Sequence, residues 1–96
     1  SPDYHKDAVY SEFYYCLKGT HEDIFATMRF DGRYKIVNYH NKEFGELYDL
    51  EKDPHEFENL WDVPEYAGLK AELIKKNFDD AVMKNMDYSM NRINDY

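Results

Sequence analysis

Several features that would place this 96-residue chain in a common class of protein are scarce or missing. Its single cysteine, Cys16, has no partner for an internal disulfide, so the chain is not a disulfide-stapled scaffold. No apolar run is long enough for a transmembrane helix or for the core of a signal peptide, and the sequence assigns no compartment. Basic residues are outnumbered, with 12 Lys and Arg against 20 Asp and Glu. The resulting charge of −8 argues against a nucleic acid or an anionic membrane as partner.

Apolar and aromatic residues are by contrast plentiful. They make up 43% and 18% of the chain, which is enough for the core of a single domain over residues 1–96. Ten tyrosines and six phenylalanines are more than one thin core easily hides. Either tyrosine hydroxyls lie exposed on a sheet, or one face lacks the partner that normally covers it. In the second case the isolated chain should self-associate.

The order of local patterns predicts strands first and a helix last. Four segments rich in aromatic and β-branched residues predict strands, at residues 8–17, 24–30, 34–40 and 46–50. Both faces of the first are largely apolar, which predicts a strand covered on both sides in a parent protein. Residues 7–50 are therefore expected to form a β meander.

The dipeptide Asp31-Gly32 is a hairpin signal between the second and third strands. A two-residue loop would place Met28 opposite Lys35. A three-residue loop ending on a left-handed Gly32 would place Met28 opposite Tyr34 and pair apolar residues with one another. We predict the second register, because a slip of one residue moves every side chain to the other face.

A short helix is predicted over residues 53–61. Asp53 has the side chain of an N-cap, and Pro54 suits the first helical position. Tyr48 and Leu50 are expected to pack beneath the start of this helix.

A second, longer helix is predicted over residues 63–86, from a broad apolar stripe at helical spacing. Asp62 and Glu65 form a capping box at its start, and Trp61 is expected to seal the junction between the two helices. Residues 87–96 are expected to form an irregular tail. The fold class is therefore α+β, with an antiparallel sheet of about four strands and a long C-terminal helix packed across one face.

Acidic residues that resemble a calcium loop do not complete one. Asp49, Glu51 and Asp53 have the spacing of the first three ligands. The glycine and the bidentate glutamate that the loop requires at its sixth and twelfth positions are replaced by Pro54 and Leu60. The histidines also lack the spacing of a zinc site. The sequence therefore predicts no catalytic residue, metal ligand or cofactor-binding residue in this chain.

A series of short motifs, taken in order and spacing, carries a family resemblance. The motifs are Asp7-Ala8-Val9-Tyr10-Ser11-Glu12, Asp31-Gly32-Arg33-Tyr34-Lys35-Ile36-Val37, Gly45-Glu46-Leu47-Tyr48-Asp49-Leu50, Asp53-Pro54 with Glu56, Asn59-Leu60, and Asp62 with Pro64-Glu65-Tyr66. Over roughly residues 7–76 the chain resembles the C-terminal subdomain of type I sulfatases, the arylsulfatase-like members of the alkaline-phosphatase-like superfamily.

The resemblance implies a parent enzyme that hydrolyses sulfate esters. That family uses a formylglycine, made from a Cys or Ser in a Cys/Ser-x-Pro/Ala-x-Arg motif, and a calcium ion, both in a larger N-terminal domain. Cys16 is followed by Leu17 and Lys18, so the motif is absent here. The resemblance therefore implies a non-catalytic domain whose partner is the catalytic domain of the same chain.

The resemblance also implies that this subdomain can lend loops to the rim of the substrate pocket. Tyr39, His40 and the 18–23 loop, which contains His21, are candidates because they lie at strand ends. Asp53, Pro54, Tyr48, Leu50, Trp61 and Gly32 are instead expected to be structural. An alternative is an independent module of the same fold that binds a protein or a glycan through exposed aromatics.

Overall fold

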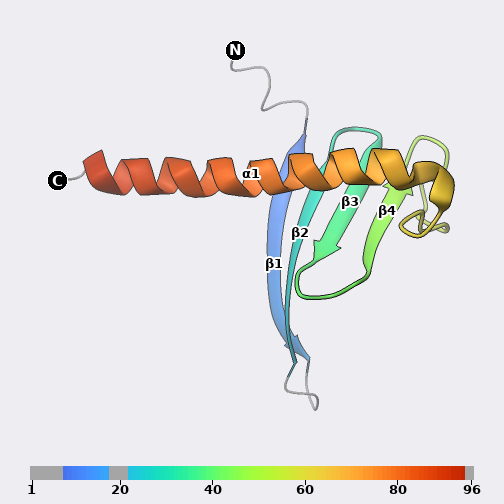
Figure 1. Cartoon of the computed structure of the whole chain (residues 1–96), viewed down its shortest axis with the longest axis horizontal. Helices are drawn as coiled ribbons and strands as arrows, with labels where there is room; N and C mark the ends of the chain where they lie inside the picture. Colours follow the sequence, from blue (N-terminus) through green and yellow to red (C-terminus); the bar gives the residue numbers. More distant parts are fainter. Residues whose placement is uncertain (1–7, 18–21, 95–96) are drawn as a thin grey trace.

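A computed structural model describes residues 8–17 and 22–94 and confirms the α+β prediction. Four strands are followed by a 3-10 turn and one long helix: β1 (Val9–Leu17), β2 (Glu22–Phe30), β3 (Tyr34–Tyr39), β4 (Gly45–Asp49), η2 (Pro64–Tyr66) and α1 (Ala67–Asn94). The strands lie in the order β1-β2-β3-β4, and each neighbouring pair is antiparallel. The helix α1 lies across one face of this sheet, and the β1–β2 ribbon extends beyond it (Figure 1).

The register between β2 and β3 differs from both loop lengths considered above. Met28 lies opposite Val37, rather than opposite Tyr34 or Lys35. The turn is displaced because the Asp31 carboxylate accepts hydrogen bonds from the N–H groups of Arg33 (2.9 Å) and Tyr34 (2.7 Å). This side-chain turn moves the bend along the chain, so the predicted pairing is wrong.

The main core lies between the sheet and the first half of α1. Ile36 and Leu47 are fully buried at the centre of the sheet, and Leu73 of α1 packs against them together with Leu60. Ile36 and Leu47 lie opposite each other on β3 and β4, so both point to the face of the sheet on which Leu60 and Leu73 pack. We call this face of the sheet the helix side.

The middle of α1 contacts the helix side through polar groups. The Asn77 amide is fully buried and donates from Nδ2 to Thr27 Oγ1 (3.0 Å). One turn further, Asp80 accepts a hydrogen bond from Arg29 Nε at 2.8 Å. The helix is thus held by apolar packing near its start and by charged and amide contacts farther along.

The predicted short helix over 53–61 is wrong, since these residues form turns and irregular backbone. Glu56 has a φ of 58°, which an α-helix does not accommodate. This conformation places the Glu56 carboxylate 3.0 Å from Lys35 Nζ. Tyr48 is buried, but it pairs with Lys35 on the face opposite α1, and Leu50 is half-buried. Neither therefore packs beneath a helix start.

Asp53 performs a capping role in this loop rather than in a helix. Its two carboxylate oxygens accept hydrogen bonds from the N–H groups of Phe57 (3.0 Å) and Glu58 (2.9 Å). Pro54 lies exposed in the adjoining turn, where its fixed φ restricts the chain. The Asp53 carboxylate therefore stabilises the irregular loop between β4 and α1.

Asn59 closes the outer edge of β4. Its Oδ1 accepts hydrogen bonds from the N–H groups of Leu47 and Trp61, both at 3.0 Å. Its Nδ2 donates to the carbonyl of Gly45 (3.1 Å), and Leu60 N–H donates to the carbonyl of Leu47 (2.7 Å). The Asn59-Leu60 motif therefore satisfies backbone groups that an edge strand would otherwise leave open.

The long helix starts later and ends later than predicted. It is preceded by η2, whose N-cap is Val63 with no side-chain cap, so the box of Asp62 and Glu65 does not form. It continues to Asn94, through the predicted irregular tail, because residues 87–94 contain neither Pro nor Gly. Among the described residues no helix is both long and apolar enough to cross a membrane.

An ion pair between a buried carboxylate and a partly exposed guanidinium fixes the end of β4. Asp49 is 3% exposed, and its carboxylate accepts hydrogen bonds from Nε and Nη2 of Arg33, both at 3.1 Å. It also accepts hydrogen bonds from the N–H groups of Glu51 (3.2 Å) and Lys52 (3.4 Å). The hydrogen bond with Arg33, helped by these N–H groups, lowers the pKa of Asp49 below its ordinary value of 3.8.

We expect this pair to make stability depend on acid pH. Because the folded-state pKa of Asp49 is depressed, its contribution is complete at neutral pH and is lost as the pH falls below about 4 through the folded pKa. Asp49→Asn should therefore cost about 1–2 kcal/mol at pH 7 and less at pH 2.5. Urea unfolding at the two pH values measures the difference. An equal loss at both pH values would contradict the expectation.

Candidate functional site

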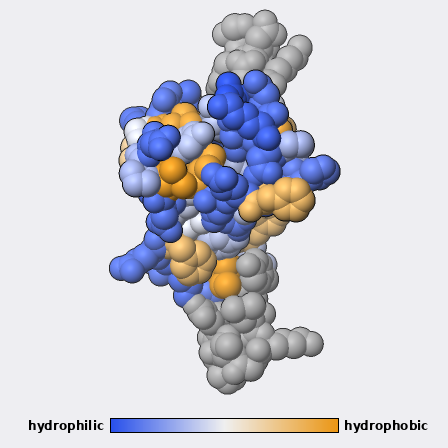
Figure 2. All heavy atoms as spheres, turned by 90° about the vertical axis from the view of Figure 1, so that its right-hand side faces the viewer, coloured by the Kyte–Doolittle hydropathy of each residue, from blue (hydrophilic) through white to orange (hydrophobic). Residues whose placement is uncertain are grey.

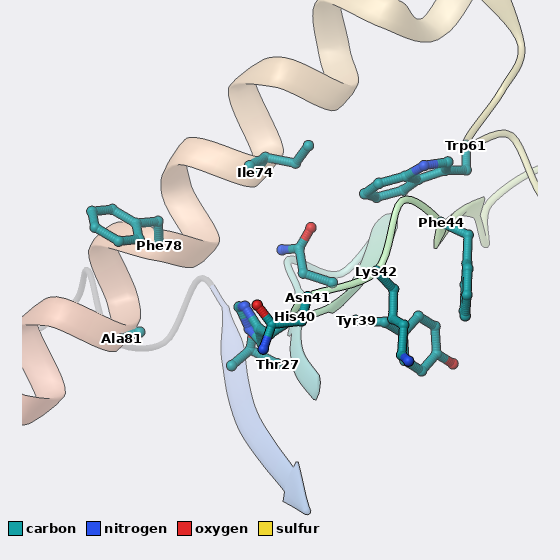
Figure 3. Close-up of a pocket in the computed structure, with 11 residues that line it drawn as sticks. Thr27, Tyr39, His40, Asn41, Lys42, Phe44, Trp61, Ile74, Phe78 and Ala81 are labelled. Carbon is teal, nitrogen blue, oxygen red and sulfur yellow. The ribbon is translucent and has the colours of Figure 1, made fainter. Parts of the chain in front are cut away.

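A pocket of about 350 Å³ lies between α1 and the turn that joins β3 to β4 (Figure 3). The helix supplies apolar side chains, and the end of β3 with its turn supplies most of the polar ones. The lining residues are Thr27, Asn38, Tyr39, His40, Asn41, Lys42, Phe44, Trp61, Ile74, Phe78 and Ala81. An apolar wall with a few polar groups is the usual composition of a small-molecule site.

Two of the three predicted rim residues, Tyr39 and His40, line this pocket, and His21 lies outside the described residues. They are consecutive at the end of β3, so their side chains leave opposite faces of the sheet. The Tyr39 hydroxyl donates to the Glu46 carboxylate, and its ring lies 5.3 Å from that of Phe44. The Tyr39 side chain therefore lies on the face of the sheet away from α1, whereas His40 lies on the same side as Thr27.

His40 is oriented by groups from two elements. Its Nε2 lies 3.0 Å from Thr27 Oγ1, and its ring centroid lies 5.3 Å from that of Phe25. Thr27 Oγ1 already accepts a hydrogen bond from Asn77, so its own proton can be donated to Nε2 of a neutral His40. The Asn77 Oδ1 is buried without a hydrogen-bond partner in the part of the chain that the structure describes. His40 is thus held at the end of a short polar chain.

Sequence reasoning missed Asn41 and Lys42, which complete the polar side of the pocket. Asn41 has a φ of 67°, a left-handed conformation that asparagine tolerates, and Lys42 N–H donates to the Tyr39 carbonyl at 3.2 Å. In Figure 3 the Asn41 amide is directed toward the space between Ile74 and Trp61. An asparagine directly after a strand was the available signal for this turn.

The electrostatic character of the pocket is unlike that of the chain as a whole. The chain carries a net charge of −8, yet none of the residues lining the pocket is Asp or Glu. His40 and Lys42 are the basic side chains among them. Since charges interact more strongly in a partly enclosed site than in bulk water, this lining favours an anionic or neutral ligand over a cation.

Among the described residues no group of three or more His, Cys, Asp or Glu side chains is placed to hold a metal ion. Asp49, one of the acidic residues at calcium-loop spacing, is already paired with Arg33. Thr27 lies beside His40 as a nucleophile would lie beside a base, but it is 4% exposed and its hydroxyl is already bonded to both His40 and Asn77. The arrangement can bind and orient a polar group.

Comparison with known proteins places these residues in a family context. A family model described as N-sulphoglucosamine sulphohydrolase, C-terminal, matches residues 1–86. An ulvan-active sulfatase from Formosa agariphila is 50% identical over 38 residues. This second match covers 40% of the chain and 8% of the relative, so the chain spans only a small part of that protein.

Proposed function

Because the chain belongs to the N-sulphoglucosamine sulphohydrolase C-terminal family, we propose that it is the non-catalytic C-terminal domain of a sulfatase, a sulfuric ester hydrolase, and packs against the catalytic domain. The family match over residues 1–86 is the observation that carries this proposal. The formylglycine nucleophile and the calcium ion expected for the parent enzyme would lie in the catalytic domain. The role of this chain is then to complete the enzyme structurally.

The second part of the proposal is that the turn after β3 forms part of the substrate-pocket rim. It is supported by the pocket lining, which includes His40 and Lys42 but no Asp or Glu, because a sulfate ester carries a negative charge that carboxylates in the lining would repel. His40 is also pre-oriented through Thr27, which lowers the entropy that binding must cost. In this arrangement His40, Asn41 and Lys42 contact substrate without taking part in bond cleavage.

Kinetics of the whole sulfatase polypeptide that contains this chain test the rim assignment. We expect His40→Ala to raise KM about 3–10-fold with little change in kcat, the effect of losing one hydrogen bond of about 1 kcal/mol equally from ground and transition states. His55→Ala is the matched control, because His55 is exposed in the loop after β4 and stacks on Phe57 at 5.6 Å. An unchanged KM for His40→Ala would contradict the rim assignment.

The 96-residue chain alone tests the non-catalytic assignment. It should not turn over an aryl sulfate ester in the presence of calcium. Saturable turnover by the purified chain would show that it holds a catalytic centre of its own and would overturn the proposal.

A further inference from the structure

The face of the sheet opposite α1, which we call the open face, is more apolar than the helix side. Its polar members with described side chains are Ser11, Lys35 and Glu46. Its apolar and aromatic members are Val9, Phe13, Ile24, Ala26, Met28, Phe30, Val37, Tyr39 and Tyr48. An antiparallel sheet with one wet face normally alternates apolar and polar residues, so this composition is that of a sheet buried on both sides.

No element among the described residues covers the open face along β1 and β2. Val9 is 57% exposed and Phe13 46% exposed, although both belong to a strand within the sheet. The helix lies on the other side (Figure 1). By comparison, the end of the molecule formed by the loop after β4 and the start of α1 shows hydrophobic residues only as separate patches among hydrophilic ones (Figure 2).

The charged side chains of the open face already have polar partners within the chain. Lys35 Nζ lies 3.0 Å from the Glu56 carboxylate, and Glu46 accepts hydrogen bonds from the hydroxyls of Tyr39 and Tyr48, the latter at 2.7 Å. Burial, followed by the hydrogen bond to Glu46, raises the pKa of Tyr48 to about 12. Covering this face would therefore desolvate the Lys35–Glu56 ion pair and a Glu46 carboxylate that keeps two hydrogen bonds, which lowers the cost relative to charges without partners.

The open face also offers a recess for a partner side chain. A hollow of about 220 Å³ lies on it, lined by Phe13, Ala26, Met28, Lys35, Val37, Tyr39 and Glu46. A recess of mixed aromatic and aliphatic walls is the kind of feature into which an anchoring side chain inserts at an interface. The strands that carry this face cover roughly 450 Å² in projection, or roughly 900 Å² when both partners are counted, which suits a contact between two domains of one chain.

We propose that the open face packs directly against the catalytic domain of the sulfatase. The inference rests on the proposed function and adds the surface of contact to it. The occupant is argued from the family match to a C-terminal domain and from the small share of a sulfatase that this chain spans. The partner surface is apolar, carries a side chain that fills the recess, and brings no unpaired charge to the sheet.

Photo-cross-linking of the whole sulfatase polypeptide tests the contact surface. The photoreactive amino acid p-benzoylphenylalanine is placed at Phe13 or Met28 on the open face, and at Met86 as the control. Met86 is 50% exposed on α1, which lies on the other side of the sheet. We expect the photoreactive residue at Phe13 or Met28 to cross-link to peptides of the catalytic domain. The same residue at Met86 should give no such cross-link.

Capture of the catalytic domain from Met86 but not from Phe13 or Met28 would overturn the face assignment while leaving the proposed function in place. Capture of a second copy of this chain from Phe13 and Met28 would overturn it too, with self-association as the occupant. A whole polypeptide that fails to hydrolyse any sulfate ester and holds no sulfatase catalytic domain would instead overturn the proposed function itself.

A second measurement does not depend on cross-linking yield. Phe13→Glu should lower the Tm of the whole sulfatase, because the carboxylate would be buried without a partner. The same substitution should leave the Tm of the 96-residue chain nearly unchanged, since Phe13 is 46% exposed there. Equal shifts in the two proteins would count against an interface at this face.

Discussion

Replacing Gly45 with alanine should destabilise the chain by about 3 kcal/mol, in the upper part of the range for overpacking. A Cβ at this position would lie 2.5, 2.6 and 2.7 Å from three carbons of the Trp61 ring. The ring has little room to move, because Lys70 Nζ lies 4.8 Å from its centroid on α1 and donates to the Trp61 carbonyl at 2.8 Å. Urea unfolding monitored by Trp61 fluorescence measures the loss directly.

The chain offers a matched control for this substitution. Gly68 lies in α1, and a Cβ added there would have no atom within 4 Å. Gly68→Ala should therefore stabilise the chain by up to about 1 kcal/mol through helix propensity. If Gly45→Ala were as well tolerated as Gly68→Ala, the result would contradict the close packing of the Trp61 ring against Gly45 of β4.

Leu47→Ala should be at least as damaging, with a loss of about 2–5 kcal/mol. Leu47 is fully buried and contacts Ile36 and Leu73, so truncation leaves a cavity between the sheet and α1. A domain of this size has a total stability of only about 5–14 kcal/mol, so the loss removes a large fraction of it. The midpoint of urea unfolding should fall accordingly, with an unchanged slope.

Val82→Ala is the comparison for Leu47→Ala, because Val82 is a branched aliphatic residue that is 37% exposed on α1. It should change stability by about 0.5 kcal/mol or less. Comparable losses from the two variants would mean that the space beneath the first half of α1 is not the core of this domain.

The strands and the long helix could be predicted because their patterns are local. The segments at 24–30 and 34–40 carry the β-branched and aromatic residues that suit a sheet, and β2 and β3 lie within two residues of those bounds. The register could not be predicted, because it depends on which backbone N–H groups the Asp31 carboxylate accepts hydrogen bonds from, here those of Arg33 and Tyr34. These hydrogen bonds shift the pairing of β2 with β3 without changing the composition of either strand.

The prediction of a short helix over residues 53–61 was wrong for a related reason. Asp53 and Pro54 supply a sound local signal for a helix start, but the Lys35 side chain lies on a strand far away in sequence. Its ion pair with Glu56 holds the loop in a conformation that a helix excludes. Tertiary contact thus overrode a local preference, as it commonly does for short segments.

The candidate site was predictable only in part. Tyr39 and His40 were found because strand ends gather functional side chains. His40 contacts Thr27, which is 13 positions away in the sequence, and Thr27 contacts Asn77, which is 50 positions away. No local sequence pattern predicts contacts at these separations. The acid-free lining is likewise a property of the assembled pocket, since acidic residues occur throughout the chain.

The closure of β4 by Asn59 and Leu60 limits how copies of this domain could join edge to edge. Among the described residues β1 pairs only with β2, so its outer backbone groups can still recruit another strand. On β4 the Leu47 N–H, the Leu47 carbonyl and the Gly45 carbonyl are already hydrogen-bonded to Asn59 and Leu60. Two copies could therefore pair through their β1 strands, but neither would present a second free edge for a third. Strand pairing would stop at a dimer and could not propagate into a fibril.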